Sequence, residues 1–185
     1  MIEQILKDVD IRMQKTLNSL VQELVTIRTG RASPSLVAHI KVDYQGIITP
    51  LNQIASISIP EVKMIMIQPW DKSAIRNIEK AILKSDIGLT PTSDGNVVRI
   101  LLPTITEERR KELIKVTHKR LEDAKISLRN LRRDGIEDLR KAEKNKEISQ
   151  DEHKQLQNQL QKVTDTYTVK MEQLGKDKEK EVMAV

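Results

Sequence analysis

The sequence predicts an α+β protein, in which three amphipathic helices pack together and a small α+β unit is inserted between the first helix and the other two. Long segments with helical spacing of apolar residues occupy both ends of the chain, and short alternating segments lie between them. Aromatic residues make up only 2% of the 185 residues, and there is no Phe. This composition favours a core of Leu and Ile between helices over an aromatic-rich β-sandwich.

The first helix is predicted from the N-terminal apolar seam. Its members are three or four residues apart, as one face of a helix requires. They are Ile2, Leu6, Val9, Met13, Leu17, Leu20, Leu24 and Ile27. Gly30 follows, and glycine readily adopts the left-handed conformation that ends many helices. We therefore expect the helix to stop at Gly30.

The middle of the chain, residues 31–105, predicts short strands and one helix. Apolar and polar residues alternate from Ile40 to Tyr44, before a Gln45-Gly46 turn, and again from Ile54 to Ile59. Further elements are expected as a short apolar strand at Met64–Ile67, a helix at Ser73–Ser85, a turn at Asp94-Gly95-Asn96 and a last strand at Val97–Leu102. Trp70 lies between a predicted strand and a predicted helix, so we expect it in the core.

The second long helix is predicted over residues 106–145, about 60 Å of rod at 1.5 Å per residue. Thr106 is a good N-cap, and Glu107 and Glu108 suit the first turn. Gly135 inside this helix is expected to allow a close approach of another helix. The third helix begins at Ser149, whose Ser-x-x-Glu spacing to Glu152 is a capping box. Its predicted seam is Leu156, Leu160, Val163, Tyr167, Met171 and Leu174.

An amphipathic helix does not bury its apolar stripe alone, so the three helices are expected to pack together. We predict a bundle domain of residues 1–29 and 106–185 and an inserted domain of residues 30–105. The chain crosses between them twice. These crossings are candidate hinge residues, because two short connections permit bending but limit tumbling: Thr29, Gly30, Arg31, Ala32, Ser33, Pro34, Leu102, Pro103, Thr104 and Ile105.

The long helix carries a one-sided basic face. With Arg110 as zero on a helical wheel, an arc from about 40° to 140° holds seven cations and one acid, Glu122. We call the cations the basic stripe: Lys111, Lys115, Lys125, Arg129, Arg132, Arg133 and Arg140. Such a face is either solvated or binds nucleic acid. The strong excess of cations on this face and the Arg129-Asn130-Leu131-Arg132-Arg133 cluster favour nucleic acid, because guanidinium groups suit phosphate. The net charge of +5 is compatible with this.

Several other functions find no support in the sequence. There is no cysteine, which excludes disulfides, thiolate zinc sites and thiol nucleophiles. His39, His118 and His153 fall in different elements, so we predict no metal site. No phosphate-binding loop ending in Gly-Lys-Ser/Thr and no nucleophile–base pair is present, so no catalytic residue and no cofactor is predicted. No apolar run is long enough to span a bilayer and no signal peptide is evident. We therefore expect a cytoplasmic protein that does not bind a membrane.

Several segments resemble the ribosome recycling factor family. The residues from Ile27 to Leu36, read as Ile-Arg-Thr-Gly-Arg-Ala-Ser-Pro-Ser-Leu, are similar to its signature. The further matches are Glu79-Lys80-Ala81-Ile82, Leu102-Pro103, Thr106-Glu107-Glu108-Arg109-Arg110-Lys111 and Arg129-Asn130-x-Arg132-Arg133-Asp134. The resemblance covers the whole chain. Gly135 departs from the stronger helix formers expected at that position.

The resemblance implies a long antiparallel three-helix bundle with an inserted β/α/β sandwich, in an L shape similar in outline to transfer RNA. It implies a factor of translation termination and ribosome recycling that binds the ribosome after termination. With elongation factor G and GTP, it would separate the subunits for reuse. It also implies that Arg110, Arg129, Arg132 and Arg133 contact large-subunit ribosomal RNA, and the protein is expected to be a monomer.

Two other classes of function remain open on the residues alone. The first is a coiled-coil adaptor with an inserted domain that binds protein only. The second is an enzyme with the insertion as a substrate domain, but Asp43, Glu61 and Asp86 have no obvious catalytic partner there.

Overall fold

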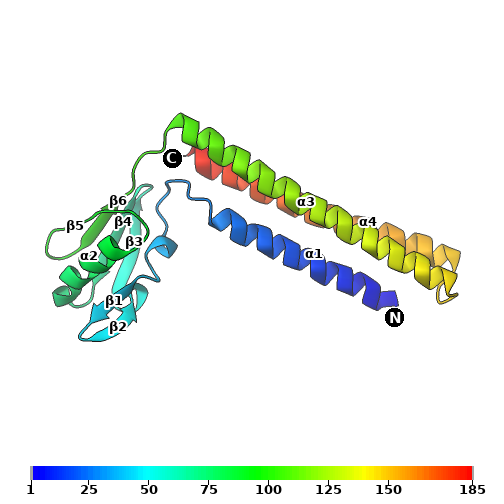
Figure 1. Ribbon diagram of the computed structural model, residues 1–185, viewed down its shortest axis with the longest axis horizontal. Coiled ribbons are helices and arrows are strands. Elements are labelled where there is room, and N and C mark those ends of the chain that lie inside the picture. Colours follow the sequence, from blue (N-terminus) through cyan, green and yellow to red (C-terminus); the bar gives the residue numbers. More distant parts are fainter. Residues whose placement is uncertain (1, 185) are drawn as a thin grey trace. The chain divides into compact units, whose positions relative to one another are not determined.

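The computed structural model describes residues 2–184, and it divides into two compact units (Figure 1). The bundle unit contains the residues up to Arg28 together with Glu107–Ala184, and the inserted unit contains Thr29–Thr106. Residues 1 and 185 of the predicted domain limits lie outside the described residues. So does the side chain of Ile2, the first position of the predicted seam.

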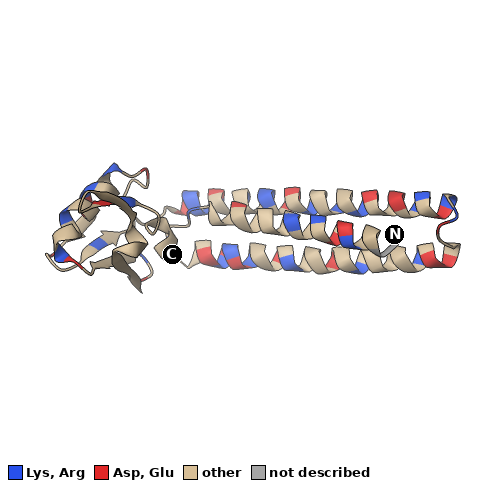
Figure 2. Cartoon of the chain, turned by 90° about the horizontal axis from the view of Figure 1, so that it is seen from below, with Lys and Arg blue, Asp and Glu red and all other residues tan. Residues whose placement is uncertain are grey.

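Three long helices form the bundle unit: α1 (Ile2–Val25), α3 (Glu107–Lys144) and α4 (Gln150–Met183). They lie side by side, and α3 runs antiparallel to both α1 and α4 (Figures 1 and 2). The predicted seam of α1 is confirmed, because its positions from Val9 to Ile27 are buried. On α3 the buried positions are Leu113, Thr117, Ala124, Leu128, Gly135, Leu139 and Ala142.

The predicted end of the first helix is wrong, and the predicted seam of the third helix lacks one buried residue. Helix α1 ends at Val25, five residues before Gly30. There the Ile27 N–H donates to the Leu24 carbonyl at 3.2 Å, three residues back, and the α-helical bonding pattern stops. Ile27 is nevertheless buried, so the apolar seam continues beyond the helix. On α4 the predicted seam member Val163 is half-buried, and the neighbouring Thr164 is buried as well, with its hydroxyl bonded to the Leu160 carbonyl of its own helix at 2.8 Å.

Two glycines allow the helices to approach closely. A Cβ on Gly135 of α3 would lie 3.0 Å from Leu160 Cδ2 and 3.1 Å from Val9 Cγ2. The prediction of a close approach at Gly135 is therefore confirmed. Gly175 of α4 plays the same part toward α3, where a Cβ would meet Leu121 Cδ2 at 2.7 Å.

Polar contacts fix the start of α4 and its position against α1. The predicted capping box is confirmed: the Ser149 side chain accepts from the Glu152 N–H at 3.2 Å, and Glu152 accepts from the Ser149 N–H at 2.7 Å. The Ser149 N–H, and with it the Ser149 hydroxyl at 2.9 Å, donate to the Glu152 carboxylate and so lower the pKa of Glu152. Further along, the Tyr167 hydroxyl donates to Asp10 Oδ1 at 2.8 Å. Burial is the larger cause and this hydrogen bond the smaller cause that raise the pKa of Tyr167 to about 12.

The inserted unit contains two antiparallel sheets and one helix. The hairpin of β1 (Lys41–Tyr44) and β2 (Ile47–Pro50) turns at Gln45-Gly46, where both residues have positive φ. The second sheet has the strand order β3-β4-β6-β5. Its strands are β3 (Ala55–Glu61), β4 (Met64–Pro69), β5 (Pro91–Ser93) and β6 (Val98–Leu101).

The core of this unit lies between the inner sheet face and α2 (Ile75–Lys84). Ile65, Ile67 and Ile100 alternate with exposed or half-buried residues and are fully buried, as are Ile78 and Ile82 of α2. The sequence did not predict β2 or β5 as strands. Neither strand buries alternate residues, so neither shows the two-residue period that predicts a strand.

The prediction that Trp70 lies in the core is wrong, because 71% of it is exposed. On β4 the inward positions are Ile65, Ile67 and Pro69, so the next residue falls on the outer face of the sheet. The alternation of the strand therefore decides the position of Trp70, despite its size.

Candidate nucleic-acid interface

The basic stripe lies on α3, beside the helix face that packs in the bundle. Figure 2 shows Lys and Arg recurring along the bundle helices, with Asp and Glu among them. Within the stripe, Lys125 and Arg132 are half-buried and the other five cations are exposed. The stripe thus has an inner edge next to α4 and an outer edge that faces solvent.

Acceptors on α4 hold the inner edge. Lys125 Nζ lies 3.0 Å from Glu172 Oε1, and Arg132 Nη1 donates to Gln161 Oε1 at 2.5 Å. Gln161 in turn donates to Asp165 Oδ1 at 2.7 Å. The His118 imidazole of α3 makes a hydrogen-bonding contact with the Glu179 carboxylate of α4.

These contacts follow a seven-residue register. His118, Lys125 and Arg132 are spaced by seven on α3. Glu179, Glu172 and Asp165 are spaced by seven in the opposite direction on α4. Each step of two helical turns therefore brings a base on α3 opposite an acid on α4. At the last step Gln161 lies between the two groups, and it fixes the Arg132 side chain.

The outer edge is available to an external anion. Among the described residues, no hydrogen bond or ion pair engages Lys111, Lys115, Arg133 or Arg140. Arg129 contacts Glu122 Oε1 at 2.6 Å, but more than half of each side chain is exposed. An exposed ion pair is worth only about 0–1 kcal/mol, so a phosphate can compete for Arg129.

The structure brings three of the four predicted RNA-contacting arginines together. Arg129, Arg132 and Arg133 lie within about one turn of α3. Arg110 lies nineteen residues before Arg129, or about 28 Å along the helix. Arg110 is half-buried, and its Nε has no hydrogen-bond partner among the described residues. The four arginines therefore offer two separate contact points on one rod.

The α4 residues of this interface were not predicted from the sequence. Gln161 and Glu172 fix Arg132 and Lys125, yet they belong to a different helix. The heptad of acids at Asp165, Glu172 and Glu179 was the available signal. The partner of each acid follows only once the register between α3 and α4 is known.

The predicted hinge residues form two segments outside the α-helices and strands, and Pro34 begins the 3-10 helix Pro34–Leu36; both segments are partly fixed to the inserted unit. The Ala32 N–H donates to the Val62 carbonyl at 2.7 Å, and the Leu102 N–H donates to the Lys63 carbonyl at 2.8 Å. Ala32 and Leu102 are buried in the core of that unit. Gly30, with a φ of 75°, holds a backbone conformation that favours glycine.

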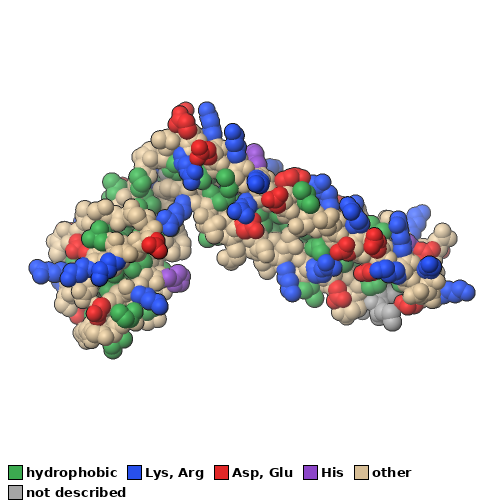
Figure 3. All heavy atoms as spheres, in the orientation of Figure 1, with side chains coloured by type: hydrophobic (Ala, Val, Ile, Leu, Met, Phe, Trp, Pro, Cys, Tyr) green, Lys and Arg blue, Asp and Glu red, His purple; other side chains and the backbone are tan. Residues whose placement is uncertain are grey.

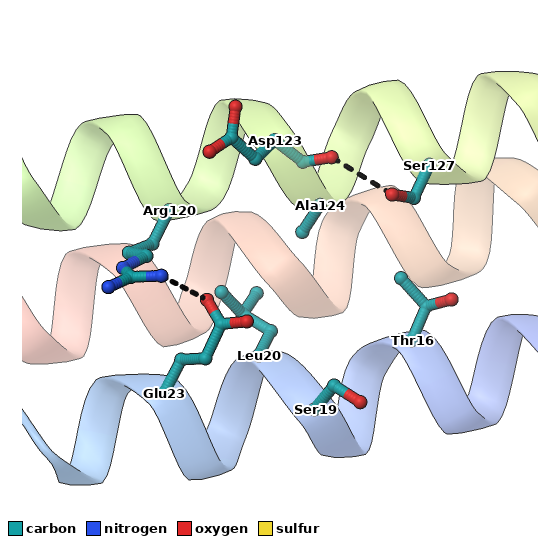
Figure 4. A pocket seen from close by; sticks show the side chains of 8 residues that line it. All are labelled: Thr16, Ser19, Leu20, Glu23, Arg120, Asp123, Ala124 and Ser127. Atoms are coloured by element: carbon teal, nitrogen blue, oxygen red, sulfur yellow. Dashed lines mark hydrogen bonds and ion pairs between the residues drawn. The ribbon is translucent and has the colours of Figure 1, made fainter.

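A groove opens between α1 and α3 within the bundle (Figure 4). It has a volume of about 240 Å³ and contains short side chains such as Thr16, Ser19 and Ala124. The Arg120–Glu23 ion pair of 3.4 Å lies across it, and the Ser127 hydroxyl bonds the Asp123 carbonyl of its own helix. The Arg120–Glu23 pair and the Ser127 hydroxyl thus have partners within the protein. The groove exists because short side chains face each other between α1 and α3.

Two kinds of feature are absent from the described residues. No group of three or more His, Asp or Glu side chains between residues 2 and 184 could hold a metal ion. In the same range, no helix is both long and apolar enough to span a bilayer.

Comparisons with known proteins give a consistent result over the whole chain. Residues 20–183 match the family model described as ribosome recycling factor. The chain is 52% identical to the ribosome-recycling factor of Dehalococcoides mccartyi and 51% identical to that of Bacillus subtilis, over 185 residues and the full length of both chains in each case.

Two solved structures are also similar. A solution structure of the ribosome recycling factor matches with a TM-score of 0.78 at 43% identity, covering 100% of this chain and 98% of the other. The second describes the T. thermophilus ribosome recycling factor and the E. coli elongation factor G bound to the E. coli post-termination complex. It matches with a TM-score of 0.66 at 39% identity, covering 98% of both chains.

Proposed function

The chain belongs to the ribosome recycling factor family, and from this premise we propose that it binds the post-termination ribosome in the cytoplasm. With elongation factor G and GTP, it separates the subunits so that they can be reused. The chemistry of GTP hydrolysis belongs to the partner, and this chain supplies binding and force transmission. The observation that carries the proposal is the full-length match to relatives that are all named ribosome-recycling factor.

The basic stripe and Arg110 are the proposed contacts with large-subunit ribosomal RNA. Arg129, Arg132 and Arg133 present three guanidinium groups within about one turn, and Gln161 fixes the middle one by a bond of 2.5 Å. A prepositioned guanidinium loses less side-chain entropy when it binds a phosphate. The unpaired outer cations add attraction that does not depend on base sequence.

The two crossings are the proposed hinge. Ala32 and Leu102 are anchored to the turn between β3 and β4. Bending is therefore confined to Thr29–Arg31 on one crossing and Pro103–Ile105 on the other. Short connections of this kind transmit a force on one unit to the other, because neither crossing has spare length.

A recycling assay tests the proposed function. Post-termination ribosomes are mixed with this protein, elongation factor G and GTP, and subunit separation is followed by light scattering. We expect separation that requires all three additions. Tight ribosome binding without separation under any condition would contradict the proposal. Complete absence of ribosome binding would favour the adaptor that binds protein only.

The hinge is tested by lengthening both crossings. Insertion of Gly-Ser after Gly30 and again after Pro103 adds slack, so we expect normal ribosome affinity and loss of subunit separation. The control inserts the same four residues after exposed Gly88, within the inserted unit. Full separation by the lengthened variant would show that the crossings transmit no force.

A further inference from the structure

A second row of cations lies on the inserted unit, away from the basic stripe. Arg76, Lys80 and Lys84 are spaced by four along α2, and Lys72 precedes them in the 3-10 turn Lys72–Ala74. We call these four residues the α2 row. All four are exposed. Figure 3 shows Lys and Arg side chains gathered over the part of the unit where Figure 1 draws α2.

The α2 row contains a single sign of charge. Arg76, Lys80 and Lys84 span an arc of about 80° on the helix, and no acid falls within that arc. The structure describes no ion pair or hydrogen bond for any side chain of the row. In the basic stripe on α3, Lys125 and Arg129 each contact a carboxylate, and the outer cations resemble the α2 row in having no partner among the described residues.

Helix stability does not explain this arrangement. Like charges spaced by four on a helix destabilise it by about 0.2–0.5 kcal/mol per pair. Arg76 lies in the first turn of α2, where the helix dipole disfavours a cation. Only Lys84, in the last turn, suits the dipole. The row therefore carries an electrostatic cost that an external polyanion would relieve.

We propose that the α2 row is a second RNA-binding surface, which contacts ribosomal RNA phosphates independently of the basic stripe on α3. The inference rests on the proposed function, which supplies ribosomal RNA as the polyanion. The cations follow one another at about 6 Å along the helix axis, so the row offers repeated point charges to a backbone of repeated charges. Exposed Leu83 is the apolar neighbour of the row, and no aromatic side chain lies on α2 to stack on a base. The contact is therefore to phosphate and independent of base sequence.

The test compares the salt dependence of ribosome binding for two full-length variants. The first carries Lys72→Gln, Arg76→Gln, Lys80→Gln and Lys84→Gln. The second is the charge-retaining control with Lys72→Arg, Arg76→Lys, Lys80→Arg and Lys84→Arg. We expect the slope of log K against log salt to become shallower in the first variant, by about one for each phosphate that it no longer neutralises. In the control the slope should stay unchanged.

A second measurement locates the RNA. Because the chain has no cysteine, Leu83→Cys provides a single attachment site for a hydroxyl-radical probe beside the α2 row. Leu101→Cys places one on the outer face of the sheet, opposite α2, where Leu101 is 66% exposed. We expect ribosomal RNA cleavage from position 83 to exceed that from position 101 several-fold.

Three results would overturn the inference. They are an unchanged salt slope in the glutamine variant, no RNA cleavage from position 83, or weaker binding only when elongation factor G is present. The last result would assign the row to a protein partner. None of these results contradicts the proposed function if the wild-type chain still separates subunits in the recycling assay. If the wild-type chain fails in the recycling assay, the proposed function itself is wrong.

Discussion

The bundle unit and the inserted unit both bury aliphatic side chains, but they differ in how charged side chains are paired between their elements. In the bundle, polar pairs connect neighbouring helices, including Arg12–Asp134 at 3.2 Å between α1 and α3 and Lys125–Glu172 between α3 and α4. In the inserted unit, the inner sheet face and α2 bury a continuous aliphatic core, and its Arg99–Asp94 pair lies at the surface. On α3 of the bundle, Lys125 is thus paired across a helix contact, whereas no cation of the α2 row in the inserted unit has a partner among the described residues.

This difference has a functional consequence. A rod of three helices has a narrow core, so much of each helix is surface on which charge can be arranged at helical spacing. An ion pair to Glu172 and a hydrogen bond to Gln161, both on α4, then orient the inner cations Lys125 and Arg132 of α3. The inserted unit has a wider core, and the outer face of α2 is free to carry a row of one sign.

The largest expected effect follows from removing an aliphatic core side chain in the inserted unit. Ile78→Ala removes a fully buried side chain of α2 and should lower the free energy of unfolding by about 2–5 kcal/mol. Leu128→Ala, at a position 1% exposed on α3, is the matched substitution in the bundle. Hydrogen exchange measured by mass spectrometry should show faster exchange mainly in the unit that carries each substitution. Equal acceleration in both units would show that they unfold as one.

Overpacking of a helix contact should have the next largest effect. Gly135→Val adds a side chain whose Cβ alone would lie 3.0 Å from Leu160 Cδ2, so we expect the free energy of unfolding to fall by about 1–3 kcal/mol in a denaturant titration. Gly135→Ala is the control. Its helix propensity gain of about 1 kcal/mol offsets much of its smaller clash. Equal stability of the valine and alanine variants would show that the contact relaxes at no cost.

Removal of the capping box should cost less. Ser149→Ala leaves the Glu152 N–H without its acceptor and should destabilise the bundle by about 1 kcal/mol, observed as a lower melting temperature by circular dichroism. Ser149→Asp keeps a capping oxygen and should remain close to the wild type. A melting temperature for Ser149→Ala equal to that of the wild type would mean that the box does not stabilise α4.

The smallest effect concerns the surface pair of the inserted unit. The Arg99 guanidinium, assisted by the Asn96 and Val97 N–H groups, lowers the pKa of Asp94 from 3.8 to about 2. A lowered pKa in the folded state means that the carboxylate stabilises the unit above pH 3.8 and loses this effect as pH falls toward 2. The difference in melting temperature between the wild type and Asp94→Asn should therefore narrow between pH 4 and pH 2. A constant difference would exclude the charge of Asp94 as its cause.

Local patterns in the sequence predicted the helices well and the inserted unit less completely. The α1 seam, the capping box at Ser149 and the close approach at Gly135 each depend on neighbours in sequence or on one helix face. The position of Trp70 depends on which face of β4 is buried, and β5 is a strand because it pairs with β6. Both depend on distant parts of the chain.

The candidate site divides in the same way. Helical spacing alone identifies the basic stripe, because its members share one helix. The pairing of Arg132 with Gln161 requires the antiparallel register of α3 and α4, which a single sequence does not supply. The RNA contacts of Arg110, Arg129, Arg132 and Arg133 stay predictions from the resemblance.

The most direct test of the account measures ribosome affinity across a range of salt concentrations. It compares the wild type with a variant that has Arg129→Ala, Arg132→Ala and Arg133→Ala. The matched control has Lys154→Ala, Lys176→Ala and Lys180→Ala, three exposed cations of α4 with the same total charge. Circular dichroism verifies that both variants fold.

The account predicts that the arginine variant loses affinity, by roughly 1–3 kcal/mol for each good bidentate contact, and that its salt slope becomes shallower. The lysine control should bind nearly as the wild type does. If the folded arginine variant binds with the affinity and salt slope of the wild type, the basic stripe does not anchor this protein on ribosomal RNA.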